Sequence, residues 1–299
     1  MATERHRKSP KEYIEPLFCV FYTFLWLNVF GFAGCAAEMK KPTHLCPGKK
    51  SAAESLALLE QRAENIVPLK ATGQCLLQYY DEDKKLKKEN FPVKLWANPP
   101  SEIYLQGDLA FDPKGIVLGS NKDEFWLAMK PKEISGYWWG RWSAGHYLDN
   151  MMIGPQILLE ALGIVRVGPQ ENWLLLNEGG FDVLVNRQGT TESRRIYINN
   201  CDYLIRRIEY FNAGQPAAVA ELDKYKKVSK GFFVPSVIKI ANLFEDKAED
   251  LASISLNLGS IKPVTFTDKQ RKRLFTRPQP QGFKHIYKIV ESDMIEQSQ

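Results

Sequence analysis

The chain has 299 residues, and its 40 lysines and arginines against 35 aspartates and glutamates give a formal net charge of +5. That balance is too mild to indicate a nucleic-acid-binding protein. The five cysteines and four histidines show no spacing typical of a metal site, and the sequence contains neither a glycine-rich phosphate loop nor a nucleophile elbow. We therefore expect no enzyme activity, no catalytic residue, no metal and no cofactor. A hydrolase whose carboxylates meet only in the fold stays an alternative.

The N-terminal segment has the three parts of a secretory signal peptide. A basic leader precedes the uncharged residues 17–34, and small residues come directly before Cys35. Residues 32–35, Phe-Ala-Gly-Cys, are similar to the bacterial lipobox, in which the cysteine is acylated and the bond before it is cleaved. We therefore predict a signal peptide of the lipoprotein type over residues 1–34 and lipidation of Cys35. Because an apolar run of this length can span a bilayer, an uncleaved anchor is the alternative.

Residues 35–50 are expected to form the lipidated cysteine and a flexible tether, since they contain two prolines and a glycine and lack an apolar period. Fully extended, a tether over residues 36–50 would reach about 50 Å. A helix is expected next, from a cap at Ser51 to the break at Pro68, because apolar residues recur there at helical spacing.

Three cysteines follow the expected signal peptide, at Cys46, Cys75 and Cys201. Because their number is odd, at most one disulfide can form among them and at least one thiol stays free. Their spacing does not say which two would pair.

From Leu69 onward the pattern changes from helical to strand spacing, with short apolar segments separated by Gly, Pro, Asn and Asp. The expected strands cover 69–79, 92–97, 102–109, 115–120, 124–130 and 134–139, and, after a helix over 155–162, also 173–177, 182–187, 194–199, 204–211, 218–227, 234–241 and 253–261. Short neighbouring strands with tight turns indicate an antiparallel sheet. The fold expected for residues 51–290 is mainly β with flanking helices, a strongly curved antiparallel sheet that forms an open, unclosed β-barrel, followed by a tail over 291–299.

Two basic runs interrupt this pattern, at residues 84–88 and 269–273. Such runs are most often solvated turns, and contact with an anionic surface is the alternative.

The order of these elements, together with several local phrases, resembles a known family. The phrases are a glycine-containing first strand at 71–74, a strand led by two prolines at 99–105, a turn and aromatic strand at 119–126, and strand pairs near 208–225 and 233–238. They are similar to the periplasmic carriers and receptors of the outer-membrane lipoprotein-sorting system, the LolA- and LolB-like proteins. The resemblance covers about residues 52–285 and implies an unclosed antiparallel barrel, capped by helices, around an apolar cavity for acyl chains. A lipobox fits the receptor branch.

Aromatic and methionine side chains are the candidates for the wall or rim of such a cavity, since acyl chains need adaptable apolar neighbours and no buried charge. The candidates are Trp126, Trp138, Trp139, Trp142, Met151 and Met152. Ordinary core positions are the alternative for each of them. Alternation keeps Trp138 and Trp139 off the same face, and an exposed tryptophan beside glycines is also typical of a saccharide platform.

Taken together, these features predict a lipoprotein of the bacterial envelope, anchored to the periplasmic face of the outer membrane through its N-terminal lipid. We expect it to bind lipid or the acyl chains of lipoproteins, in lipoprotein sorting or envelope lipid handling, and to bind no nucleic acid; an envelope protein partner is compatible with this role. The alternatives are a cell-wall or carbohydrate-binding lipoprotein that uses the tryptophan cluster, and the hydrolase named above.

Overall fold

The computed structural model describes residues 46–80, 83–110, 112–131, 134–142, 154–165, 170–243, 252–290 and 293–297. All of these residues belong to one compact unit, Pro42–Gln299. The predicted signal peptide, Cys35, Met151 and Met152 lie outside the described residues. None of the helices that the structure describes is long and apolar enough to cross a membrane.

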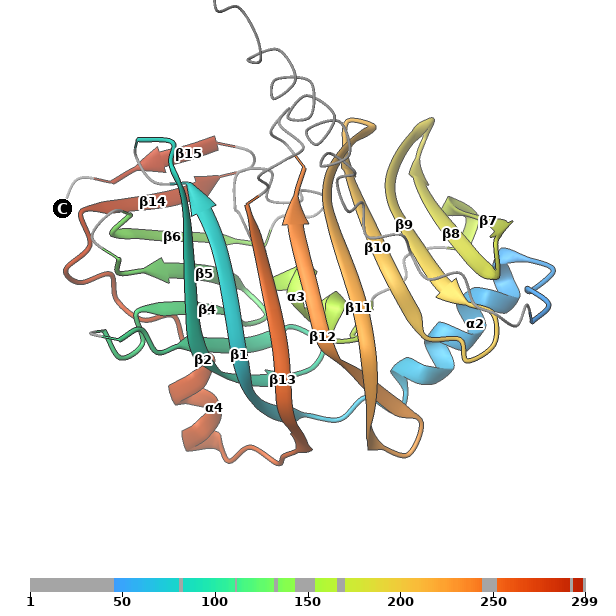
Figure 1. Cartoon of the computed structure of the whole chain (residues 1–299), viewed down its shortest axis with the longest axis horizontal. Helices are drawn as coiled ribbons and strands as arrows, with labels where there is room; N and C mark the ends of the chain where they lie inside the picture. The colour runs from blue at the N-terminus through green and yellow to red at the C-terminus, as the bar shows by residue number, and fades with distance from the viewer. Residues whose placement is uncertain are drawn as a thin grey trace, which may run out of the picture. The chain divides into compact units, whose positions relative to one another are not determined.

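The described strands join in one sheet of fifteen members (Figure 1). In chain order the elements are α2 (Ala52–Ala63), β1 (Leu69–Tyr80), β2 (Leu86–Asn98), β3 (Glu102–Gly107), β4 (Ile116–Ser120), β5 (Glu124–Met129), β6 (Gly136–Arg141), α3 (Pro155–Ala161), the 3₁₀ turn η1 (Gln170–Asn172), β7 (Trp173–Glu178), β8 (Phe181–Gln188), β9 (Thr191–Asn199), β10 (Ile205–Asn212), β11 (Gln215–Ser229), β12 (Phe232–Asn242), β13 (Ser253–Pro263), α4 (Asp268–Leu274), β14 (His285–Val290) and β15 (Asp293–Glu296). The mainly β fold with flanking helices is confirmed.

The sheet is unclosed, as predicted. Its order is β15-β14-β6-β5-β4-β3-β2-β1-β13-β12-β11-β10-β9-β8-β7, so β15 and β7 are its free edges. Strands β1 to β6 follow one another from the middle of the sheet toward one edge. Strands β7 to β13 follow one another from the opposite edge to the middle, where β13 pairs with β1. The pairs are antiparallel except that β14 runs parallel to β6, where the sequence indicated an antiparallel sheet throughout. The segment that includes α4 is long enough to carry the chain back in the same direction.

The sheet curves around helix α3, which contacts both β4 and β11 although these strands lie far apart in the strand order. In Figure 1, β4, β5 and β6 run across the view at a steep angle to β1 and β13. Leu158 and Leu162 at α3 are fully buried against the apolar side chains of the concave face. The helix therefore fills the interior that the curvature creates.

Apolar side chains are buried on both faces of the sheet. The concave face carries the main core, to which β1 contributes alternate residues such as Cys75 and Leu77. A smaller cluster on the outer face of β4, β5 and β6 consists of Val117, Trp126, Ala128, Tyr137 and Phe283. Phe283 belongs to the segment between α4 and β14, which also accepts a 2.6 Å hydrogen bond from the Tyr137 hydroxyl at the Pro278 carbonyl. The segment after α4 therefore covers this part of the outer face.

The start of the described chain is fixed to the sheet by a covalent bond and a buried carboxylate. Cys46 forms a disulfide with Cys201 in the turn between β9 and β10. Asp182 on β8 is fully buried, and its carboxylate accepts hydrogen bonds from the backbone N–H of Lys49 at 3.0 and 3.2 Å and from the Ser55 hydroxyl at 3.1 Å. Residues 46–50, which composition placed in the tether, therefore pack as part of the folded domain.

Cys75 is the thiol that this disulfide leaves free, as the odd number of cysteines required. Burial among apolar neighbours disfavours the thiolate and raises the pKa of Cys75 to about 12. The thiol is therefore an unreactive core side chain at neutral pH. Because the disulfide, both apolar clusters and all the described strands lie within Pro42–Gln299, a fragment of residues 42–299 contains the whole folding unit.

The basic run 269–273 is solvent-exposed, as expected, but it forms helix α4 and not a turn. A capping box starts it: the Thr267 side chain accepts a hydrogen bond from the backbone of Gln270, whose side chain returns to the backbone of Thr267. Leu274 and Phe275 are buried at its other end and hold it to the sheet. The predicted tail over 291–299 likewise contains a strand, β15, paired with β14.

Candidate ligand cavity

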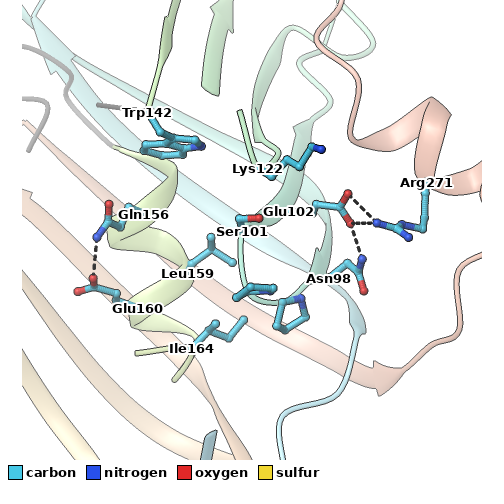
Figure 2. Close-up of a pocket in the computed structure, with 12 residues that line it drawn as sticks. Asn98, Ser101, Glu102, Lys122, Trp142, Gln156, Leu159, Glu160, Ile164 and Arg271 are labelled. Atoms are coloured by element: carbon cyan, nitrogen blue, oxygen red, sulfur yellow. Dashed lines mark hydrogen bonds and ion pairs between the residues drawn. The ribbon is translucent and has the colours of Figure 1, made fainter. Parts of the chain in front are cut away.

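A cavity of about 550 Å³ opens between helix α3, the turn from β2 to β3, and helix α4 (Figure 2). It is lined by Asn98, Pro99, Pro100, Ser101, Glu102, Lys122, Trp142, Gln156, Leu159, Glu160, Ile164 and Arg271. Small-molecule sites in proteins have volumes of about 300–1,000 Å³, so this cavity is large enough to hold an organic ligand.

The β2–β3 turn forms one wall of the cavity. Pro99 and Pro100 present rigid apolar rings there, and the Ser120 hydroxyl on β4 fixes the turn by donating a 2.7 Å hydrogen bond to the Ser101 carbonyl. Because the Ser120 bond uses the backbone of Ser101, it leaves the side chain of Ser101 free to line the cavity, as drawn in Figure 2.

Helix α3 forms the opposite wall. Pro155 occupies the first turn, where its missing N–H costs no helical hydrogen bond, and Gly163, at φ +86°, ends the helix in the left-handed region. Helical spacing places Gln156, Leu159 and Glu160 on one face. That face lines the cavity, while Leu158 points to the main core.

Trp142 lies just after β6 and closes the cavity from the side. Its indole N–H donates a 2.7 Å hydrogen bond to the Asn121 carbonyl in the β4–β5 turn, and its ring lies 5.0 Å from the Phe125 ring, tilted by 49°. These two contacts fix the indole while leaving it half-buried, so it offers an apolar surface to a ligand.

A buried ion pair lies where α3 meets the second half of the sheet. Glu160 is 2% exposed, and its carboxylate accepts hydrogen bonds from the Arg194 guanidinium at 2.8 Å, the Tyr210 hydroxyl at 2.9 Å and the Gln156 amide at 3.1 Å. The Arg194 guanidinium in turn lies 5.1 Å from the centre of the Trp173 ring. The sequence led us to expect no buried charge at the cavity wall. That expectation is wrong at Glu160, a buried carboxylate that lines the cavity and is paired with Arg194.

The rim carries charged groups of both signs. Arg271 on α4 donates from one nitrogen to both carboxylate oxygens of Glu102, at 3.0 and 3.2 Å, and Asn98 donates to the same carboxylate. Lys122 in the β4–β5 turn is exposed at the rim. Figure 2 shows these groups on the side of the cavity away from Gln156 and Glu160. The cavity therefore combines an apolar wall with a polar rim that carries two cations and one anion.

The tryptophans predicted from the sequence are divided between the two faces of the sheet. Trp142 lines the cavity, and Trp138, on the concave side, packs against the main core and stacks on Tyr287 at 5.8 Å. Trp126 and Trp139 belong to the outer face, where Trp126 is fully buried. The two faces of β6 thus separate Trp138 from Trp139, as alternation predicts, and the three tryptophans at 138–142 do not form one saccharide platform.

Most of the lining residues were not among the sequence candidates. Pro99 and Pro100 were expected in a turn, but not as a wall of the cavity. Arg271 was not a candidate because it lies in a basic run that was expected to be solvent-exposed. One signal was readable: Gln156 and Glu160 are polar residues four apart in an otherwise apolar helix, which indicates a polar face with a partner. Among the described residues no group of three or more His, Cys, Asp or Glu could hold a metal ion.

No protein-family model and no curated protein matches this chain. The fold is similar to several solved structures. A domain from Vibrio parahaemolyticus described as an outer membrane lipoprotein-sorting protein domain matches with a TM-score of 0.47 and 13% identity over 74% of this chain and 96% of that one. A LolA superfamily protein from Nitrosomonas europaea matches with a TM-score of 0.46 and 12% identity over 75% and 97%. A DUF1329 family protein from Desulfovibrio piger matches with a TM-score of 0.46 and 9% identity over 75% and 98%. These likenesses are of fold alone.

Proposed function

We propose that this protein binds a lipid, or the acyl chains of a lipoprotein, in the cavity beside α3, without covalent chemistry. The observation that carries the proposal is the pairing of apolar walls with a charged rim in one space of about 550 Å³. Leu159, Ile164, Trp142 and the two prolines supply contacts for a hydrocarbon chain, and burial of apolar area contributes roughly 25 cal/mol per Å². The rim cations suit a polar or anionic head group.

The interior on the Leu158 side of α3 has an apolar lining. A second cavity, of about 20 Å³, lies on the Leu158 side of the helix and is lined by Leu77, Phe91, Leu105, Ile116, Leu118, Leu127, Met129, Leu158 and Ile254. It is too small for an acyl chain, so a long chain would extend into it only if α3 moved away from the sheet. Its purely apolar lining would accept a hydrocarbon chain at no cost in buried charge.

Replacing Ser101 with tryptophan should block the mouth of the cavity. Ser101 is held through its backbone carbonyl, so the substitution leaves the hydrogen bond from Ser120 intact while adding a large ring at the cavity surface. We expect at least a roughly tenfold loss of affinity for a fluorescent fatty acid, equivalent to about 1.4 kcal/mol. Titration of the 42–299 fragment measures it.

The matched control is Gln74→Trp, which adds the same ring at an exposed position on the outer face of β1. It should bind the fatty acid as the wild type does, and both variants should melt close to the wild-type temperature. Unchanged affinity in a folded Ser101→Trp variant would show that the ligand does not use this cavity. Retention of the wild-type fragment on glycan, with no fatty-acid binding, would favour the carbohydrate alternative.

We further propose that Cys35 is acylated and holds the domain at a membrane of the bacterial envelope. The proposal is supported by the lipobox-like sequence and by the Cys46–Cys201 disulfide, since disulfides persist in oxidising compartments such as the periplasm. The mass of the protein purified from its native membrane should equal that of residues 35–299 plus acyl chains. A mature protein that retains residues 1–34 would instead support the uncleaved anchor.

A further inference from the structure

Cross-strand register places two lysines and two aromatic residues side by side on the outer face of the sheet. Lys262 on β13 pairs with Lys70 on β1, Lys70 pairs with Trp96 on β2, and Trp96 pairs with Tyr104 on β3. We call Lys262, Lys70, Trp96 and Tyr104 the outer row. Because directly paired residues of a sheet point to the same face, all four side chains leave the sheet on one side.

The aromatic members of the outer row are partly open to solvent. The Trp96 and Tyr104 rings lie 5.8 Å apart and are tilted by 51°, and both side chains are of intermediate burial. The row continues through Gly119 to Trp126, and there Phe283 and its segment cover the face. The aromatic surface is therefore covered at β5 and open at β2 and β3.

Basic side chains surround the open part. Lys70 and Lys262 are exposed, and helix α4 adds the exposed Arg273. Helix α4 lies beside the start of β3, where Arg271 pairs with Glu102 at 3.0 Å. Burial, followed by the charge of Asp108, raises the pKa of Tyr104, and the charge of Arg273 opposes that shift. Figure 1 shows α4 beside the end of the sheet at which β1 begins and β13 ends.

Two nearby carboxylates are already paired with other cations, and a third, Asp268 on α4, is outnumbered by the basic residues of that helix. Asp108 accepts from Lys94 at 2.9 Å, and Glu102 accepts from Arg271. Both pairs are internally neutral. The charges of Lys70, Lys262 and Arg273 therefore give the face around Trp96 and Tyr104 a net positive character.

We propose that the outer row, together with Arg273, docks the domain on an anionic lipid surface. Tryptophan and tyrosine are the side chains that favour the membrane–water interface, because each has an apolar body and a polar tip. Each lysine or arginine near an anionic surface strengthens binding by about fivefold. Charge complementarity and aromatic chemistry thus point to the same partner.

The outer row also borders the ligand cavity. Asn98 and Glu102, the next pair of β2 and β3 on the same face as Trp96 and Tyr104, line the cavity rim, and α4 carries both Arg271 at the rim and Arg273. Docking through the outer row would bring the cavity mouth close to the lipid surface. The docking inference does not depend on the proposed function, since a domain can bind a membrane without binding a lipid in its cavity.

The test is sedimentation of the 42–299 fragment with vesicles. We expect it to bind vesicles of phosphatidylglycerol and phosphatidylcholine more strongly than vesicles of phosphatidylcholine alone, and less strongly as salt is raised. The triple variant Lys70→Glu, Lys262→Glu, Arg273→Glu should lose about a hundredfold in vesicle affinity. Trp96→Thr, which keeps a good strand former, should weaken binding through the aromatic contribution alone.

The control with matched charge is the triple variant Lys88→Glu, Lys130→Glu, Lys239→Glu, whose three sites are exposed and outside the outer row. It should keep most of the vesicle affinity. Equal losses of vesicle affinity in the two triple variants would show that only net charge matters and would overturn the docking site. A wild-type fragment that does not bind anionic vesicles would also overturn it. Fatty-acid titration without vesicles should be unchanged in the outer-row variants, so a failure of docking is distinguishable from a failure of ligand binding.

Discussion

Replacing Cys46 and Cys201 with serine is expected to lower the free energy of unfolding by about 2–5 kcal/mol. The disulfide joins residues 155 positions apart, so its loss releases more than half the length of the domain in the unfolded chain. It also frees the segment that places the Lys49 N–H on the buried Asp182 carboxylate. Denaturant unfolding of the 42–299 fragment measures the change.

The wild-type fragment in reducing buffer is the natural control, because it lacks the same bond without any substitution. It should unfold at the same denaturant concentration as the double-serine variant. Under denaturing, non-reducing conditions the wild type should show a single reactive thiol, that of Cys75. Equal stability of the oxidised and reduced forms would contradict a structural role for the disulfide.

Replacing Glu160 with alanine is expected to destabilise the domain by about 3–5 kcal/mol, because the Arg194 guanidinium would keep its charge in the core without a carboxylate beside it. Tyr210 and Gln156 would lose their acceptor as well. Since these groups join α3 to β9 and β10, we expect fatty-acid affinity to fall in the folded fraction. Chemical unfolding and ligand titration of the same sample separate the two effects.

Two controls test this reading of the ion pair. The double variant Glu160→Leu, Arg194→Met removes both charges and should recover most of the lost stability. Glu102→Gln breaks the exposed ion pair with Arg271 at the cavity rim and should affect stability far less, because solvent screens that pair. If Glu160→Ala and Glu102→Gln lowered the free energy of unfolding by similar amounts, burial of the ion pair would not determine the loss of stability.

Alternation and turn residues were enough to predict most strands, because side chains on the concave face are buried at every second position. Along β1, for example, Leu69, Cys75 and Leu77 face the core while Lys70 faces solvent. The C-terminal elements were missed for physical reasons. Helix α4 has little apolar surface of its own and depends on its capping box and on Phe275, and β14 and β15 form at an edge where few positions are buried.

Which strands become neighbours was beyond the sequence, and so was the cavity. The pairing of β1 with β13 joins residues nearly two hundred positions apart, and nothing local specifies it. The cavity wall depends on that closure, since α3 reaches Arg194 and Tyr210 only when the second half of the sheet has returned. Trp142 and Trp126 were equivalent candidates for the cavity lining in the sequence. Trp142 follows the end of a strand and lines the cavity, whereas Trp126 is covered by Phe283 from a distant segment.

The disulfide between Cys46 and Cys201 also shortens the tether that would join the domain to a lipidated Cys35. Ten residues, 36–45, separate Cys35 from Cys46 in the sequence, and ten fully extended residues would span about 33 Å, where fifteen would span about 50 Å. A globular unit of this size has a radius of gyration of about 18 Å, so the extended tether is no longer than the diameter of the domain. The tether would then be attached to the domain at the β9–β10 turn, which holds Cys201. The domain would reach the membrane by rotating about that attachment point.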